Sequence, residues 1–149
     1  MDFKQNEIVD ELHSQRENIQ KFIEPFLSRW TRYSLPFCMV VFYSKDMSEE
    51  HCKQHIRQTD SYIKLEKNLA CIALEGLDTN TAISLLEQLF YAKENQYKNS
   101  NKEFYASLVC SSQDKEELIN KSFMILEYAF EYKRKNEILD FGIIGNKII

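Results

Sequence analysis

Glycine is scarce in this chain of 149 residues, which contains only Gly76, Gly142 and Gly145. No two of them are adjacent, so the sequence excludes the usual glycine-rich loop whose backbone N–H groups cradle a phosphate. Long apolar runs are also missing, since no stretch approaches the roughly 18 residues of a membrane span. The N-terminus has no apolar signal core. We therefore expect no membrane segment and a cytoplasmic location.

A surplus of positive charge is missing as well. The formal net charge is −4, whereas a broad nucleic-acid binder needs a basic face, so we expect no nucleic-acid partner. Cysteine is present but widely spaced, and three of the four cysteines lie in apolar, strand-like runs where a thiol packs as a small hydrophobe. We predict reduced thiols rather than a disulfide framework for the set Cys38, Cys52, Cys71 and Cys110.

Apolar residues recur at helical steps from Ile8 to Trp30, which predicts one or two amphipathic helices. Pro25 should kink this helix or begin a second one. The polar middle, residues 13–18, indicates that the first part projects from the domain. Two interpretations stay open: a helix packed on the domain, or a helical stem that pairs with another chain.

The centre of the chain predicts a β-hairpin, with strands at 61–65 and 69–74 around a polar Glu66-Lys67-Asn68 tip. A continuous apolar run at 35–43 predicts a central strand buried on both faces. Ser48 should cap a helix of about three turns, Asp78 or Thr79 the next helix, and residues 112–114 the last one. Residues 93–102 should form a polar loop, 104–110 a strand, and 138–141 a short final strand.

This order predicts an α+β fold with a ferredoxin-like β-α-β-β-α-β core and an antiparallel sheet, flanked by an N-terminal and a C-terminal helix. Right-handed crossovers would place the two connecting helices on one sheet face. We predict an N-terminal helical segment packed on the domain at 1–34, an α/β domain at 35–141, and an apolar tail at 142–149.

Several segments resemble the GGDEF domain, the diguanylate cyclase fold of bacteria. Arg57-Gln-Thr-Asp60 stands six residues before Glu66-Lys67-Asn68-Leu69-Ala70, which is the family's spacing between Arg-x-x-Asp and Gly-Gly-Asp/Glu-Glu-Phe. Further similarities lie across nearly the whole chain: Asp10-Glu-Leu12-His13, Arg32-Tyr33 before Pro36, Glu117-Leu118-Ile119, Ile125-Leu126-Glu-Tyr-Ala129, and Arg134-Lys135-Asn136.

This sequence departs from the family pattern at the positions that the resemblance assigns to phosphate and metal binding. The resemblance implies phosphate binding at the paired glycines, where Glu66-Lys67 here places side chains. It implies two Mg²⁺ ions held by carboxylates, where this chain has Asn68 and Tyr43. Only about a dozen residues join Ser44 to Arg57, too few for the helical pieces that wall the nucleotide pocket. We therefore predict no enzyme, no catalytic residues, no cofactor and no metal.

Arg57 and Asp60 are the candidate ligand-binding residues, because the family's Arg-x-x-Asp binds cyclic di-GMP. Arg57 has a planar fork suited to a phosphate or a guanine edge, and Asp60 can accept from guanine N–H groups. The alternative is an ordinary turn pair at a helix end.

Two other groups of residues have structural and functional interpretations. His51 and His55, four residues apart with Cys52 beside them, either chelate a metal such as Zn²⁺ or line a solvated helix face. The basic and aromatic cluster either ends a helix or meets an anionic partner; its residues are Tyr128, Tyr132, Lys133, Arg134 and Lys135.

Three functions remain from this sequence. The leading one is a non-catalytic GGDEF-like regulatory module that binds a protein partner or self-associates through its N-terminal helix and apolar tail. The alternative is a cyclic di-GMP receptor acting through Arg57 and Asp60. An enzyme of another kind in this fold has no residue set to support it.

Overall fold

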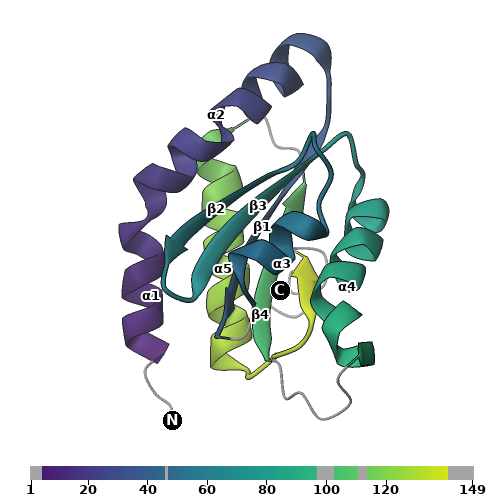
Figure 1. The fold of residues 1–149 in the computed structure, drawn as a ribbon. Helices are drawn as coiled ribbons and strands as arrows, with labels where there is room; N and C mark the ends of the chain where they lie inside the picture. Colours follow the sequence, from purple (N-terminus) through teal and green to yellow (C-terminus); the bar gives the residue numbers. More distant parts are fainter. Residues whose placement is uncertain (1–4, 46, 97–102, 111–113, 141–149) are drawn as a thin grey trace.

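The chain folds into helices and strands in a computed structural model that describes residues 5–45, 47–96, 103–110 and 114–140. Two helices come first, and the strands and the remaining helices follow in the predicted order (Figure 1). The elements are α1 Gln5–Ser14, α2 Arg16–Tyr33, β1 Phe37–Ser44, α3 Glu49–Gln54, β2 Ser61–Glu66, β3 Leu69–Glu75, α4 Thr79–Gln96, β4 Phe104–Cys110, α5 Lys115–Glu131 and β5 Ile138–Asp140.

The strands form one five-stranded sheet in the order β2-β3-β1-β4-β5. Strand β1 lies in the centre and is almost entirely buried, as its apolar sequence predicts. Within the set β2, β3, β1 and β4, each pair of neighbouring strands is antiparallel, and β5 pairs in parallel with β4 at the edge of the sheet. The hairpin and the α+β core are therefore confirmed, while the predicted tail at 142–149 lies outside the described residues.

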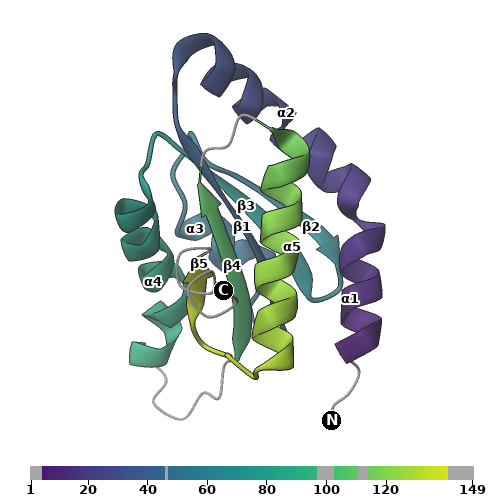
Figure 2. The same ribbon diagram turned by 180° about the vertical axis from the view of Figure 1, so that it is seen from behind.

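Helices cover both faces of the sheet (Figures 1 and 2). Alternate residues of β1 point to opposite faces, so Phe37, Met39 and Val41 join one core cluster with α1, α2 and α5. Cys38, Val40 and Phe42 join the other cluster, with α3 and α4. Both connecting helices, α3 and α4, therefore share one face, as right-handed crossovers predict.

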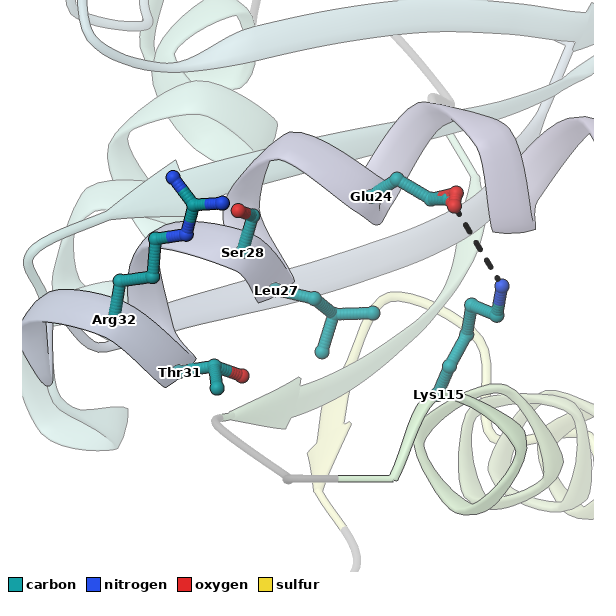
Figure 3. Close-up of a pocket in the computed structure, with 6 residues that line it drawn as sticks. All are labelled: Glu24, Leu27, Ser28, Thr31, Arg32 and Lys115. Atoms are coloured by element: carbon teal, nitrogen blue, oxygen red, sulfur yellow. Dashed lines mark ion pairs between the residues drawn. The ribbon is translucent and has the colours of Figure 1, made fainter.

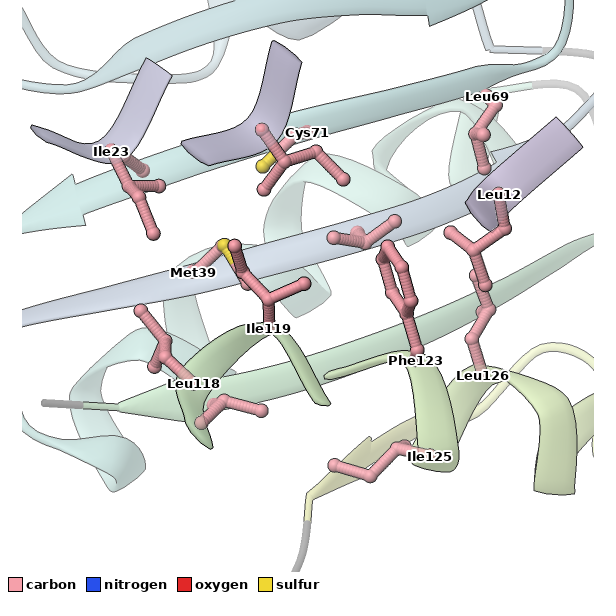
Figure 4. Packing of buried hydrophobic residues seen from close by; sticks show 14 of the residues in the cluster. Leu12, Ile23, Met39, Leu69, Cys71, Leu118, Ile119, Phe123, Ile125 and Leu126 are labelled. Carbon is pink, nitrogen blue, oxygen red and sulfur yellow. The ribbon is translucent and has the colours of Figure 1, made fainter. Parts of the chain in front are cut away.

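The N-terminal helices are packed against the domain and do not project from it. Leu12 and Ile23 are fully buried in the same cluster as Phe123 of α5 (Figure 4). The polar middle pairs with polar groups of α5: His13 Nε2 lies 2.8 Å from Glu127 Oε2, and Arg16 donates to Glu116 at 3.1 Å. The expected projection is wrong because these polar residues face another helix rather than solvent alone.

Pro25 neither begins a helix nor ends one. It is exposed within α2, and the break between the two N-terminal helices falls at Gln15 instead. Gln15 has φ −94° and ψ 4°, outside the regular helical range. The prediction that Pro25 begins a second helix is wrong, because tertiary packing of the apolar side of α2 keeps the helix continuous through this residue. A kink at Pro25 stays a prediction.

Side-chain caps begin the later helices where the sequence predicts them. Ser48 accepts from His51 N at 3.0 Å, Asp78 from Thr81 N at 2.8 Å, and Asp114 from Glu116 N at 2.9 Å. The lengths of two helices differ from the prediction. Helix α3 has only six residues, and α4 continues to Gln96, through the first part of the predicted loop at 93–102.

A disulfide joins Cys38 of β1 to Cys110 of β4, so the prediction of reduced thiols is wrong for this pair. The two residues are 72 positions apart in sequence but are direct partners in the β1–β4 register, with a Cα–Cα distance of 3.9 Å. Cys52 and Cys71 are free, as predicted, and both are buried. Among the described helices, none is long and apolar enough to cross a membrane.

Candidate functional site

Arg57 and Asp60 form a fork in the turn that leads from α3 into β2. Arg57 Nε donates to Asp60 Oδ2 at 2.9 Å, and Arg57 Nη2 donates to Asp60 Oδ1 at 2.7 Å. The backbone closes the same turn, since Asp60 N donates to Arg57 O at 2.9 Å. These hydrogen bonds to Asp60 raise the pKa of Arg57.

The Asp60 carboxylate is saturated by donors from this chain. Besides the fork, Arg57 N donates to Oδ2 at 2.9 Å and Glu75 N donates to Oδ1 at 3.1 Å. An ionised carboxylate offers about four acceptor sites, and all are used here. The Asp60 side chain is 0% exposed, whereas that of Arg57 is 40% exposed. Asp60 therefore holds the turn, and only Arg57 presents a polar surface to solvent.

Glu75, at the end of β3, connects this turn to the N-terminal helices. Its backbone carbonyl accepts from Arg57 Nη2 at 2.6 Å, and its side chain pairs with Arg29 of α2. Arg29 in turn lies over the ring of Phe26, with its Cζ 4.9 Å from the ring centroid. A chain of contacts thus runs from α2 through Glu75 to Arg57 and Asp60.

The hairpin tip lies at the opposite end of β2 and β3 from this turn. Glu66 pairs with Leu69 across a two-residue turn of Lys67 and Asn68, after a register shift between Lys64 and Glu66. Asn68 O accepts from Ser44 N at 2.8 Å, which ties the tip to the end of β1. Glu66 is the one carboxylate in the tip, and it accepts from Gln15 Nε2 at 2.5 Å. The tip carboxylate is thus held toward the α1–α2 junction.

Tyr43 occupies the end of β1, next to the tip. It pairs with Leu69 on one side and Tyr105 on the other. The ring centroid of Tyr43 lies 6.0 Å from that of Phe130, and Tyr105 lies 4.8 Å from the same ring. The side chain at this strand end therefore serves aromatic packing against α5.

His51 and His55 do not form a solvated face, because His51 is buried. Its Nε2 lies 2.7 Å from Leu89 O, and His55 Nδ1 lies 2.9 Å from His51 O. Burial raises the pKa of the neighbouring Cys52 thiol to about 12. Within the part of the chain that the structure describes, no three His, Cys, Asp or Glu side chains gather as metal ligands. The solvated-face interpretation is corrected: His51 packs between α3 and α4.

A shallow groove of about 340 Å³ lies between α2 and the start of α5 (Figure 3). Glu24, Leu27, Ser28, Thr31 and Arg32 of α2 line one side, and Lys115 lines the other. Lys115 Nζ lies 3.8 Å from Glu24 Oε1. The groove carries charges of both signs and is separate from the Arg57 turn and the hairpin tip.

Comparison with protein-family models and with curated protein sequences finds no match. Solved structures do match. A GGDEF domain of YfiN (TpbB) from Pseudomonas aeruginosa superposes with TM-score 0.70 at 10% identity, covering 89% of this chain and 92% of the other. The GGDEF domain of DgcB from Caulobacter crescentus, in complex with c-di-GMP, gives 0.67 at 6% identity over 84% and 89%. This chain has the GGDEF-domain fold.

A third neighbour is a microbial GGDEF domain described for its interaction with cyclic di-GMP. It matches with TM-score 0.68 at 12% identity, over 84% of this chain and 92% of its own. The expected GGDEF-like fold is confirmed by these matches. The assignment of Glu66–Ala70 to the motif position and of Arg57 and Asp60 to ligand binding stays a prediction.

The sequence identified the fork residues of the GGDEF-like domain but missed their neighbours. Glu75 and Arg29 complete the contacts around the fork, yet they lie 18 residues after Arg57 and in a different helix. Gln15, which holds Glu66, was also missed. The signal that a sequence offers for such contacts is weak, because each depends on the packing of separate elements.

Proposed function

We propose that this chain is a non-catalytic GGDEF-like module that acts in regulation through protein interaction in a bacterial cytoplasm. The observation that carries the proposal is the hairpin tip. Lys67 and Asn68 form its turn, and Glu66 is already held by Gln15. A nucleotide's phosphates need close backbone approach, which side chains at these positions obstruct.

The strand end beside the tip supports the same proposal. Mg²⁺ bound to substrate phosphates requires one or two protein carboxylates. Tyr43 at the end of β1 packs on Phe130, and Asn68 supplies an amide instead of a carboxylate. The scaffold of the fold is kept while the groups that would hold metal and phosphate are replaced.

Exposed apolar side chains on α5 and at its C-cap, Tyr132, support the interaction role. Met124 is 45% exposed and Tyr132 is 57% exposed. They lie with Tyr128 at steps of four residues, and the rings of Tyr128 and Tyr132 are 4.6 Å apart. The N-terminal helix, predicted as a contact surface, buries its apolar side against α5, so we assign the partner surface to this α5 stripe.

A second function is favoured by the exposure of Arg57. The fork leaves Nη1 out of the hydrogen bonds described above, and two structural neighbours are described with cyclic di-GMP. In this alternative, cyclic di-GMP binds through Arg57 with Asp60 as the positioning partner. The saturated state of Asp60 makes this the weaker proposal, because guanine finds no acceptor site left on that carboxylate.

Calorimetric titration distinguishes these functions. The protein is titrated with cyclic di-GMP and, in parallel, with GTP plus Mg²⁺. The non-catalytic interaction module predicts no saturable heat with either ligand. Saturable cyclic di-GMP binding that is lost in Arg57→Ala establishes the receptor instead.

The chain offers a matched control for that variant. Arg134 forms the same fork three residues apart, donating to Glu137 at 2.8 and 2.6 Å. Arg134→Ala removes an equivalent fork at a distant site, so a receptor keeps its dinucleotide binding in this variant. Saturable GTP–Mg²⁺ binding would contradict the proposal of a dismantled nucleotide site.

A further inference from the structure

The Cys38–Cys110 bridge links the two strands at the centre of the sheet. Cys38 and Cys110 face each other in the antiparallel β1–β4 register, and the bridge joins residues 72 positions apart in the sequence. Cys38 belongs to the core on the α3–α4 side of the sheet, and Cys110 is partly buried against that core. Because the strand register itself brings the two sulfurs together, they remain neighbours whether or not they are bonded.

The four cysteines differ sharply in access to solvent. Cys110, at the end of β4, is partly exposed, whereas Cys38, Cys52 and Cys71 are 0% exposed. Burial raises the pKa of both Cys52 and Cys71. Cys110 is therefore the cysteine most open to a reagent in solution, and its bonded partner Cys38 is buried.

The backbone next to Cys38 can also accommodate the reduced thiol of this residue. The Cys38 sulfur lies 3.5 Å from the backbone carbonyl oxygen of Leu77. When the bridge is open, the Cys38 thiol can donate a hydrogen bond to this oxygen. Opening the bridge thus leaves no buried polar hydrogen without an acceptor, and the core can hold either state.

We propose that Cys38 and Cys110 form a reversible thiol–disulfide site at which Cys110 exchanges with a small-molecule disulfide such as oxidised glutathione. The Cys110 thiolate attacks the glutathione disulfide, forms a mixed disulfide and releases one glutathione thiolate. Cys38 then loses its proton, attacks the Cys110 sulfur and displaces the second glutathione. The protein loses two hydrogen atoms, and one oxidised glutathione becomes two reduced molecules.

Exchange in defined glutathione mixtures, followed by intact-mass and peptide-mapping mass spectrometry, tests this site. Oxidised glutathione should convert the reduced native protein to the Cys38–Cys110 form with Cys52 and Cys71 unmodified. Excess reduced glutathione should return it to four thiols. The bridged form should melt at a temperature higher by roughly 5–15 °C, because the bridge closes a long loop.

Two variants test the order of attack. Cys38→Ala should trap one glutathione on Cys110, because no second thiol displaces it. Cys110→Ala should stay unmodified while folded, because Cys38 is buried. Equal labelling of both variants overturns the order, and failure of the wild-type bridge to form or to open in glutathione overturns the site.

A measurement on the wild-type protein tests the order of attack even if one of the variants fails to fold. A brief pulse of oxidised glutathione on the reduced, native wild-type protein should give a transient adduct mapped to Cys110. The same pulse in concentrated urea should label all four cysteines, which shows that the selectivity depends on the fold. A transient adduct mapped to Cys38, Cys52 or Cys71 in the native protein contradicts the proposal.

Discussion

At the scale of single residues, Asp60 shows how a short motif can stabilise the fold. Its carboxylate accepts four hydrogen bonds, three from Arg57 and one from Glu75 N, and its side chain is 0% exposed. A buried carboxylate is tolerated only when it is paired and hydrogen-bonded. The Arg57–Asp60 fork therefore fixes the entry into β2 against the end of β3.

Removing the Asp60 carboxylate should destabilise the protein. Asp60→Ala leaves Glu75 N without its acceptor and Arg57 without its fork, so we expect the free energy of unfolding to fall by about 2–3 kcal/mol. Urea unfolding followed by circular dichroism measures this. Glu137→Ala is the matched control, since Glu137 accepts the equivalent fork from Arg134 but is 44% exposed. It should change stability by less than about 1 kcal/mol, and an equal loss in both variants contradicts the structural role.

The buried thiol of Cys52 should make the folded protein less stable at alkaline pH. Burial and the nearby Glu49 carboxylate raise the pKa of its thiol from 9.0 to about 12. Between these values the unfolded chain has lost this proton while the folded chain retains it, so stability falls as pH rises through this window. Near pH 10 the raised pKa of the Cys52 thiol should lower the free energy of unfolding by about 1 kcal/mol.

Urea unfolding near pH 7 and near pH 10, with the disulfide kept intact, tests this dependence. Tyr62, whose pKa burial raises to about 12, weakens the fold in the same direction, so the comparison is made between proteins. Cys52→Ala should lose less stability on going to the higher pH than the unaltered chain loses. The same loss in both would show that the Cys52 thiol does not titrate in this way.

At the scale of elements, the two N-terminal helices form a layer on α5 and the sheet. Leu12, Ile19 and Ile23 are fully buried in the core that α5 shares. Arg29 of α2 pairs with Glu75 of β3, so α2 also reaches the Arg57 turn. A displacement of α2 would therefore disturb both the core and the end of the hairpin.

Pro25 should limit the stability of α2, because it lies within the helix without a backbone N–H to donate. Pro25→Ala restores that donor at an exposed position, and we expect the free energy of unfolding to rise by about 1–3 kcal/mol. Thermal and urea unfolding measure the change. Lys21→Ala, at an exposed position one turn earlier, should leave stability within about 0.5 kcal/mol. A loss of stability in Pro25→Ala would mean that the proline sets a helix shape required by the core.

At the scale of the whole molecule, the pattern of apolar residues predicted the sheet and its two covered faces. The buried strand at 35–43, the hairpin around Glu66-Lys67-Asn68 and the helix caps depend on local sequence, so they could be read directly. The GGDEF-domain fold followed from the order of these elements and is confirmed by superposition at TM-scores of 0.67–0.70 with three solved domains.

Features that depend on distant pairing could not be read in the same way. The Cys38–Cys110 bridge requires the β1–β4 register, which sets two residues 72 positions apart against each other. The contacts of His13 and Arg16 require α5 to lie beside α1 and α2. Residue type alone also cannot show that the donors of Asp60 come from its own turn and from β3.

The most direct test of the proposal that this chain has no working cyclase site is an assay for cyclic di-GMP formed from GTP and Mg²⁺. The purified protein is incubated with both, beside an active diguanylate cyclase and a blank without protein, and products are separated by liquid chromatography with mass detection. Because Lys67 and Asn68 form the tip and Tyr43 packs on Phe130, we predict no cyclic di-GMP above the blank. Product that increases with protein concentration would contradict the account.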